Sequence, residues 1–170
     1  CSFTKSMHVF SCDISHCFFL QIYRDEQFDA LLERKRFGVF DVFRDRQITK
    51  GLQNAPNGVW VVKSKNIPRN GAELIHIDNG IGDSYIDPGI LQNLQVCAYL
   101  NRENTFLVPN MTYYPRMLRK PDGVVANGSV AILTPRPNIV VTDEDIEFIA
   151  SEEFENFYRI ARNHATRSLN

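Results

Sequence analysis

Residues 129–161 read SVAILTPRPNIVVTDEDIEFIASEEFENFYRIA, and this stretch changes from strand-like to helix-like halfway along. Its start, Ser129–Leu133, is short, apolar and partly β-branched, which predicts a buried strand. Thr142–Asp145 (TDED) is typical of a helix N-terminus, where a hydroxyl and early carboxylates satisfy free backbone N–H groups. Ser151 opens a second helix, whose apolar side chains recur at helical spacing: Phe154, Phe157, Tyr158 and Ala161. The stretch therefore predicts one strand followed by a pair of helices.

Upstream of residue 129, the sequence predicts strands more often than helices. Alternating or β-branched runs predict strands at Phe37–Phe43, Val59–Lys63, Glu73–Ile77 and Thr105–Val108. Helices are predicted at Arg24–Arg36 and Pro88–Leu100, and loops at Asn79–Pro88, Asn110–Lys120 and Pro121–Gly128. Because helices do not alternate with strands, we expect an α+β fold, with a mixed, mainly antiparallel sheet and helices at the C-terminal end.

Length and composition limit the class of protein. The chain has 170 residues, of which 44% are hydrophobic and 23% charged, as in ordinary globular domains. It has no apolar run of the roughly 18 residues needed to span a bilayer and no signal-peptide pattern, so we expect a cytoplasmic protein with reduced cysteines. We expect residues 1–36 to form a linker or packed edge segment, and residues 37–170 the main domain. The start at Cys1 and the stop at Asn170 indicate a piece of a longer protein.

The net charge of −1 hides an uneven distribution of charge. The basic segment, Arg44–Arg69, carries one acid, Asp45, and six bases: Arg44, Arg46, Lys50, Lys63, Lys65 and Arg69. The acidic segment, Asp143–Glu155, carries seven acids and no base. We expect the basic segment to form a face that suits nucleic acid. The acidic segment should face away from that surface and pack five apolar side chains against the sheet: Ile146, Phe148, Ile149, Phe154 and Phe157.

Patterns that would indicate catalysis are incomplete. The first seventeen residues contain zinc-type ligands, but their spacing matches no zinc finger, ribbon or knuckle: Cys1, His8, Cys12, His16 and Cys17. No nucleophile elbow accompanies His76 or His164. Asp41 and Asp45 together with Lys63 and Lys65 are the residue types of a metal-dependent nuclease, yet neither lysine has an acid two positions before it. A nuclease or other hydrolase fragment is the alternative hypothesis.

Polar and aromatic side chains suited to DNA recognition gather in the second half of the chain: Asn110, Thr112, Tyr113, Tyr114, Arg116, Arg119, Lys120 and Asn127. Arginine can donate two hydrogen bonds to guanine, asparagine can pair with adenine, and lysine neutralises phosphate. Tyrosine can stack on an exposed base. The alternative is a tyrosine-rich edge of the core with a solvated basic rim, and residue types alone leave both interpretations open.

Three pairs of segments, taken in order, resemble a known family. They are Phe40–Thr49 (FDVFRDRQIT) with Val61–Ile67 (VVKSKNI), Pro109–Arg116 (PNMTYYPR) with Asn127–Leu133 (NGSVAIL), and Phe154–Asn163 with Arg167–Asn170. Such segments recur in the specificity regions of bacterial adenine-specific restriction-modification methyltransferases of the Taq type. Their order is also similar to the specificity subunits of type I systems. The resemblance covers about residues 37–170.

The resemblance implies a target-recognition domain that contacts the major groove of double-stranded DNA while a neighbouring methyltransferase domain flips out the target adenine. No Asn-Pro-Pro-Tyr tetrad and no glycine-rich cofactor loop is present, so this segment is expected to bind no cofactor or metal and to lack catalytic residues. S-adenosylmethionine would bind the methyltransferase domain of the parent chain. We expect base contacts from the Asn110–Lys120 loop and phosphate contacts mainly from Arg44–Lys65. The expected DNA-binding residues are Arg44, Arg46, Lys63, Lys65, Asn66, Asn110, Thr112, Tyr113, Tyr114, Arg116, Arg119, Lys120, Asn127 and Arg167.

Overall fold

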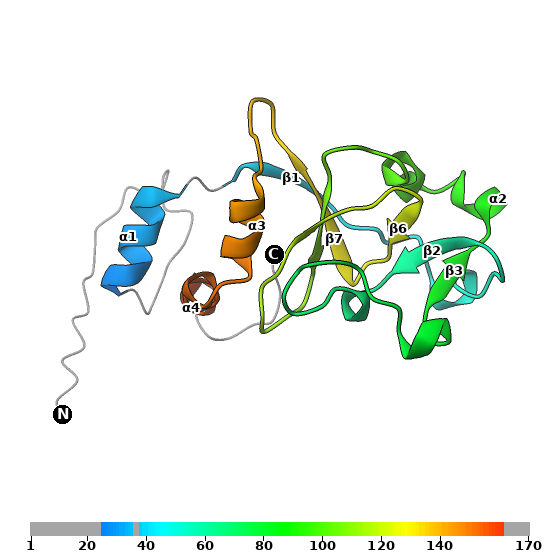
Figure 1. Ribbon diagram of the computed structural model, residues 1–170. Coiled ribbons are helices and arrows are strands. Elements are labelled where there is room, and N and C mark those ends of the chain that lie inside the picture. The colour runs from blue at the N-terminus through cyan, green and yellow to red at the C-terminus, as the bar shows by residue number, and fades with distance from the viewer. Residues whose placement is uncertain (1–24, 36–37, 162–170) are drawn as a thin grey trace.

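The computed structural model describes residues 25–35 and 38–161, and within them the chain has the expected α+β fold (Figure 1). The strands are β1 (Phe40–Phe43), β2 (Val59–Val62), β3 (Ser84–Ile86), β4 (Phe106–Pro109), β5 (Leu118–Arg119), β6 (Val124–Ala126) and β7 (Val130–Pro135). The helices are α1 (Glu26–Arg34), α2 (Pro88–Leu91), α3 (Asp143–Ile149) and α4 (Glu152–Ala161). None of these helices is long and apolar enough to cross a membrane.

The described strands form two sheets. The larger sheet is antiparallel throughout and has the strand order β1-β7-β4-β5. The smaller sheet has the order β3-β2-β6, with β2 antiparallel to β3 and parallel to β6. The chain crosses between the two sheets several times, and the shortest of these connections is the turn between β6 and β7, residues 127–129. This turn therefore holds the two sheets side by side.

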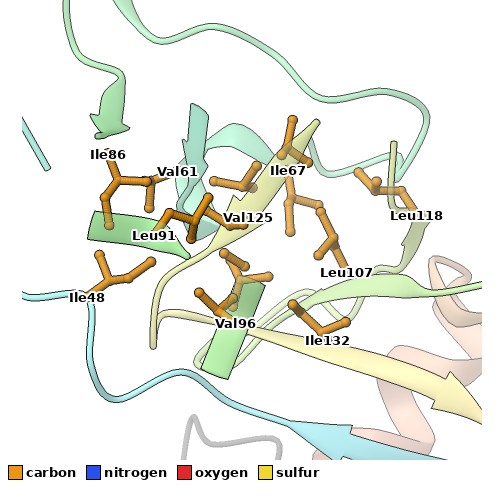
Figure 2. Packing of buried hydrophobic residues seen from close by; sticks show 14 residues of the cluster. Ile48, Val61, Ile67, Ile86, Leu91, Val96, Leu107, Leu118, Val125 and Ile132 are labelled. Atoms are coloured by element: carbon orange, nitrogen blue, oxygen red, sulfur yellow. The ribbon is translucent and has the colours of Figure 1, made fainter. Parts of the chain in front are cut away.

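The main hydrophobic core joins both sheets. Val61 of β2 and Val125 of β6 are fully buried and share this core with Leu107 of β4 and Ile132 of β7. Figure 2 shows these side chains pointing toward one another, with Val96 beside them. Burying a side chain of this size contributes about 1.5–3 kcal/mol. The apolar, largely β-branched residues of these strands thus account for the position of the core.

Both faces of β4 are covered, which explains why every residue of this strand is buried. Leu107 faces the main core, while Phe106 and Val108 lie in a second cluster with Ile146 and Ile149 of α3. The N-terminus of α3 is closed by a capping box, in which Thr142 and Asp145 bond each other's backbone N–H groups. The helix start predicted at Thr142–Asp145 is confirmed.

A third cluster links the described part of the N-terminal segment to the end of the chain. Phe28 and Leu31 of α1 pack against Phe157 of α4, and the rings of Phe28 and Phe157 stack at 4.7 Å. Phe148 and Phe154 also pack in this cluster. The prediction that all five apolar side chains of the acidic segment pack on the sheet was therefore wrong. Only the two isoleucines do so, because α1 takes the other face of the helix pair.

Several predicted elements need correction. Glu73–Ile77 is not a strand, since the backbone N–H and C=O groups of Ile75 bond Asn66 instead of a neighbouring strand. The loop predicted at Asn79–Pro88 contains β3, and the loops predicted at Asn110–Lys120 and Pro121–Gly128 contain β5 and β6. The helix predicted at Pro88–Leu100 stops after one turn, because the backbone is extended at Leu94. A short 3₁₀ helix, Gln95–Tyr99, follows.

Candidate nucleic-acid interface

Several segments singled out in the sequence converge where β1, β2 and β4 end. The backbone N–H of Asn110, after β4, donates to the Ser129 carbonyl at 2.9 Å, and the Asn127 N–H donates to the Val62 carbonyl at 3.2 Å. Ser64, after β2, donates its N–H to the Ser129 hydroxyl oxygen at 3.1 Å. Because β7 begins between these strand ends, its N-terminal turn holds them together. Residues far apart in the sequence thus form one surface.

Arg44 and Asn110 connect the end of β1 to this surface. The Arg44 Nε donates to the Gly128 carbonyl at 3.2 Å, and the Asn110 side-chain oxygen, in the amide orientation that satisfies both groups, accepts from Arg44 Nη2 at 2.8 Å. Gly128 packs so closely that a Cβ atom at this position would lie 2.8 Å from the Asp45 carbonyl oxygen. Only glycine fits here without displacing the backbone. Arg44 therefore helps to position the turn that joins the sheets.

The two acids considered for a nuclease serve other contacts. Asp45 is buried, and its Oδ2 accepts hydrogen bonds from the backbone N–H groups of Gln47 and Ile48. Asp41 lies on β1 and pairs with Arg136 at 3.1 Å. Over residues 25–35 and 38–161, no group of three or more His, Cys, Asp or Glu side chains could hold a metal ion.

Asn66 is the central polar residue after β2. Its side chain is fully buried, accepts from the Lys63 N–H, and donates to the Ile75 carbonyl and to Asp83 at 2.9 and 2.7 Å. Burial raises the pKa of Asp83, but hydrogen bonds from His76, Asn66 and the Ile77 N–H outweigh this and hold it below its ordinary value. Asn66 is thus engaged inside the fold and shapes the loop that follows β2.

The imidazole of His76 rests on the indole of Trp60, with ring centroids 4.3 Å apart. Its Nδ1 bonds the buried carboxylate of Asp83. Lys63 donates to the carbonyl of Gly82 on the same loop, at 3.4 Å. Sequence analysis did not connect these residues, because nothing in their spacing signals the contact.

Arg116 and Thr112 hold the loop after β4. The Arg116 guanidinium is half-buried and donates to the Ser64 carbonyl, the Ile67 carbonyl and the Thr112 hydroxyl, while burial lowers its pKa. The Thr112 hydroxyl also accepts from the Tyr114 N–H at 3.0 Å. These bonds turn the polar side chains inward and leave other residues of the loop exposed: Met111, Tyr113 and Tyr114.

Lys120 and Arg119 lie on the other side of this loop, at β5. Lys120 is buried, donates to the carbonyls of Leu100 and Pro121, and has its pKa lowered by burial to about 8. Arg119 pairs with Asp143 of α3 at 2.9 Å. Both side chains are therefore occupied by contacts within the protein.

The expectation that the acidic segment lies apart from the basic residues was wrong. Asp143 pairs with Arg119, and Glu155 of α4 lies 3.8 Å from Arg69 of the basic segment. Arg69 also lies over the ring of Tyr114, 3.7 Å from its centroid. A cavity of about 320 Å³ is lined by residues of both groups, including Arg69, Tyr114 and Glu155. Helix α4 borders the loop because its neighbour α3 packs on the face of the larger sheet.

The predicted DNA-binding residues therefore separate by exposure. Six are exposed: Arg44, Arg46, Lys65, Tyr113, Tyr114 and Arg119. Three are half-buried: Lys63, Arg116 and Asn127. Four are buried: Asn66, Asn110, Thr112 and Lys120. Arg167 and the cysteine and histidine residues near the N-terminus (Cys1, His8, Cys12, His16 and Cys17) lie outside the described residues.

Met111 of the same loop is not among the predicted residues. It is 62% exposed although the residues on either side of it, Asn110 and Thr112, are buried.

Comparisons with known proteins give no independent family assignment. The chain matches no protein-family model, and it matches no curated protein. Its resemblance to methyltransferase specificity regions accordingly stays a prediction.

Proposed function

We propose that this chain is a sequence-specific recognition module for double-stranded DNA, that it serves an N6-adenine methyltransferase of a restriction-modification system, and that it is not catalytic by itself. The observation that supports this best is the convergence of strand ends from both sheets around Arg44, Asn110 and the turn at residues 127–129. Loops held on a rigid sheet are a common location for binding residues.

The charges around these loops suit a phosphate backbone. Arg46 and Lys65 are exposed, and each follows a strand that ends at this surface. Phosphate contacts supply much of the affinity of DNA-binding proteins and orient them on the duplex. We assign phosphate contacts to these two residues, with Lys63 beside them.

Four buried or half-buried polar side chains hold the exposed parts of these loops in position. Asn66, Asn110, Thr112 and Arg116 bond the backbone or other side chains of the loops. We therefore assign base contacts to the exposed part of the Asn110–Lys120 loop, and a positioning role to these four side chains. Such preorganisation lowers the entropy cost of binding.

The remaining parts of the proposal concern the parent enzyme. The methyltransferase domain would supply S-adenosylmethionine binding and adenine flipping, and it is the protein partner that we propose for this module. The setting would be the bacterial cytoplasm, where the DNA lies. A nuclease role has less support, because Asp45 caps a turn and Asp41 pairs with Arg136.

Salt-dependent DNA binding tests the proposal. We expect the 170-residue chain to bind a fluorescently labelled duplex in low salt, with an affinity that falls steeply as salt rises. Arg46→Gln should reduce the slope of log affinity against log salt by about one unit. Arg102→Gln is the matched control, because Arg102 is also exposed but precedes β4, at the opposite end of that strand. No binding at high micromolar protein would refute the proposal.

A further inference from the structure

Lys120 lies directly after β5, and its long side chain is buried. The residue is only 8% exposed. Its backbone N–H donates to the Thr105 carbonyl at 2.8 Å, which fixes the start of the side chain. Its amino nitrogen, Nζ, donates to the carbonyls of Leu100 and Pro121 at 2.7 and 2.9 Å. The amino group is therefore held in one place by bonds at both ends of the side chain.

The two carbonyl acceptors match the hydrogen-bonding needs of a neutral amine. An ammonium group has three N–H donors, whereas a neutral amine has two and a lone pair. In the part of the chain that the structure describes, Nζ bonds two acceptors, so loss of one proton breaks neither bond. Burial lowers the pKa of Lys120 to about 8, although the attraction of Asp122 opposes this shift. At pH 8 about half of the chains therefore carry the neutral, nucleophilic amine.

Lys120 also lines a cavity of about 280 Å³. The other charged residues around this cavity are Glu103, Arg119 and Asp122. Its volume is near the lower end of the range for ligand pockets, roughly 300–1,000 Å³. The cavity adjoins the residues that precede β4, whereas the surface assigned to DNA lies after that strand. A buried amine and a space for a small molecule thus occur together, away from the proposed DNA interface.

We propose that Lys120 is a covalent binding site for small aldehydes, with which its amino group forms an imine. This inference goes beyond the proposed DNA recognition and does not depend on it. Lysine amines that are desolvated inside a protein form such bonds with carbonyl compounds. The Nζ lone pair attacks the carbonyl carbon of the aldehyde, and a carbon–nitrogen double bond replaces the carbon–oxygen bond. The oxygen leaves as water together with the two hydrogens of the amine.

The surrounding carbonyls can accommodate the product. After the imine takes up one proton from water, it keeps a single N–H group, which can donate to the Pro121 carbonyl. The Leu100 carbonyl then loses Nζ but still accepts from the backbone N–H of Gly123 at 3.3 Å. Neither carbonyl is left without a donor, so the reaction avoids the free-energy cost of an unsatisfied buried group.

Reductive labelling of the 170-residue chain tests the proposal. The chain is incubated with acetaldehyde and sodium cyanoborohydride, which donates a hydride and converts the imine into a stable N-ethyl lysine. Peptide mapping by mass spectrometry locates each ethyl group. At pH 7.5 we expect labelling of Lys120 to be at least about ten-fold faster than labelling of the exposed Lys50 and Lys65, because burial raises its share of neutral amine.

Two variants and a denaturant serve as controls. Asp122→Asn removes the carboxylate that raises the pKa of Lys120, so half-maximal labelling should move to lower pH. Asp78→Asn is the matched control, because Asp78 is also an exposed acid but lies in the loop before β3, outside the cavity lining. This change should leave the pH profile unaltered. In concentrated urea, Lys120 should be labelled at the rate of Lys65, since unfolding removes its environment.

Three results would overturn the imine site. The first is equal labelling of Lys120 and Lys65 in the folded chain. The second is labelling of Lys120 that begins only in urea, because the amine would then be enclosed and would serve only to bond the two carbonyls. The third is a pH profile that Asp122→Asn leaves unchanged. DNA binding by the same chain is measured separately, so failure of either proposal leaves the other standing.

Discussion

The Nε of Arg116 donates to the carbonyl oxygen of Ile67 at 2.9 Å, across 49 positions of sequence. This bond joins the loop after β4 to the chain that follows β2. Both loops belong to the surface that we assign to DNA, so their relative position depends on an arginine that lies half inside the protein.

Replacing Arg116 by alanine should loosen both loops. The side chain makes four hydrogen bonds, and its removal leaves the Ile67 and Ser64 carbonyls without this partner. We expect a loss of about 2–4 kcal/mol in the free energy of unfolding, measured by urea denaturation. Binding should weaken for all duplex sequences alike. Unchanged stability combined with relaxed preference at one base pair would instead make Arg116 a base-reading residue.

Asn66→Ala should destabilise the protein by about 2–4 kcal/mol, since it leaves buried partners unsatisfied. The Asn66 side chain is fully buried and bonds the Lys63 N–H, the Ile75 carbonyl and Asp83. Asn70→Ala is the matched control: Asn70 is exposed, accepts one backbone hydrogen bond, and should change stability by less than about 1 kcal/mol. Thermal or urea unfolding measures both, and equal effects would show that Asn66 is not the centre of this network.

Acid should weaken the fold partly through Asp83. Its folded-state pKa is lowered, so the stability it provides is fully present above the unfolded-state pKa, about 3.9, and is lost as pH falls toward the folded-state value. We expect the difference in unfolding free energy between the wild type and Asp83→Asn to be constant near neutral pH and to shrink below about pH 4. Urea titrations over this range measure it. A difference that grows on acidification would contradict the lowered pKa.

Gly128→Ala should strain the turn between β6 and β7. The added Cβ would lie 2.8 Å from the Asp45 carbonyl oxygen, which is backbone and cannot move aside cheaply. We expect a loss of about 1–3 kcal/mol, which lowers the melting temperature by several degrees. Gly51→Ala is the control, because a Cβ at Gly51 meets nothing within 4 Å. If calorimetry finds the two variants equally stable, the turn tolerates the extra atom and does not require glycine.

Elements with local signals could be predicted from sequence, whereas those that depend on distant partners could not. The start of α3 was predictable because Thr142 and Asp145 close it within four residues. Strands β5 and β6 are two and three residues long, too short to show a period, and exist because β4 and β2 lie beside them. The apolar stripe of Pro88–Leu100 is real, but its residues reach the core from two separate turns.

The same holds for the candidate site: features that depend on residue type could be predicted from sequence, and features that depend on distant contacts could not. Residue chemistry placed Asn110 and Asn127 in one group of candidates, and in the structure the Asn110 N–H bonds the Ser129 carbonyl in the turn at residues 127–129. It could not tell which polar side chains turn inward, because the burial of Asn66 and Arg116 depends on contacts with segments outside their own loops. Met111 is exposed for the same reason: its neighbours are held by distant partners.

The sequence predicted a main domain that begins at residue 37, but the stacking of Phe28 on Phe157 means that the folding unit includes α1. A chain shortened to start at residue 37 would lose α1 and uncover the aromatic cluster on α4, which includes Phe154 and Phe157. Freshly exposed aromatic surface of this kind promotes self-association. The smallest fragment that stays monodisperse in solution should therefore begin before Asp25, the residue that caps α1.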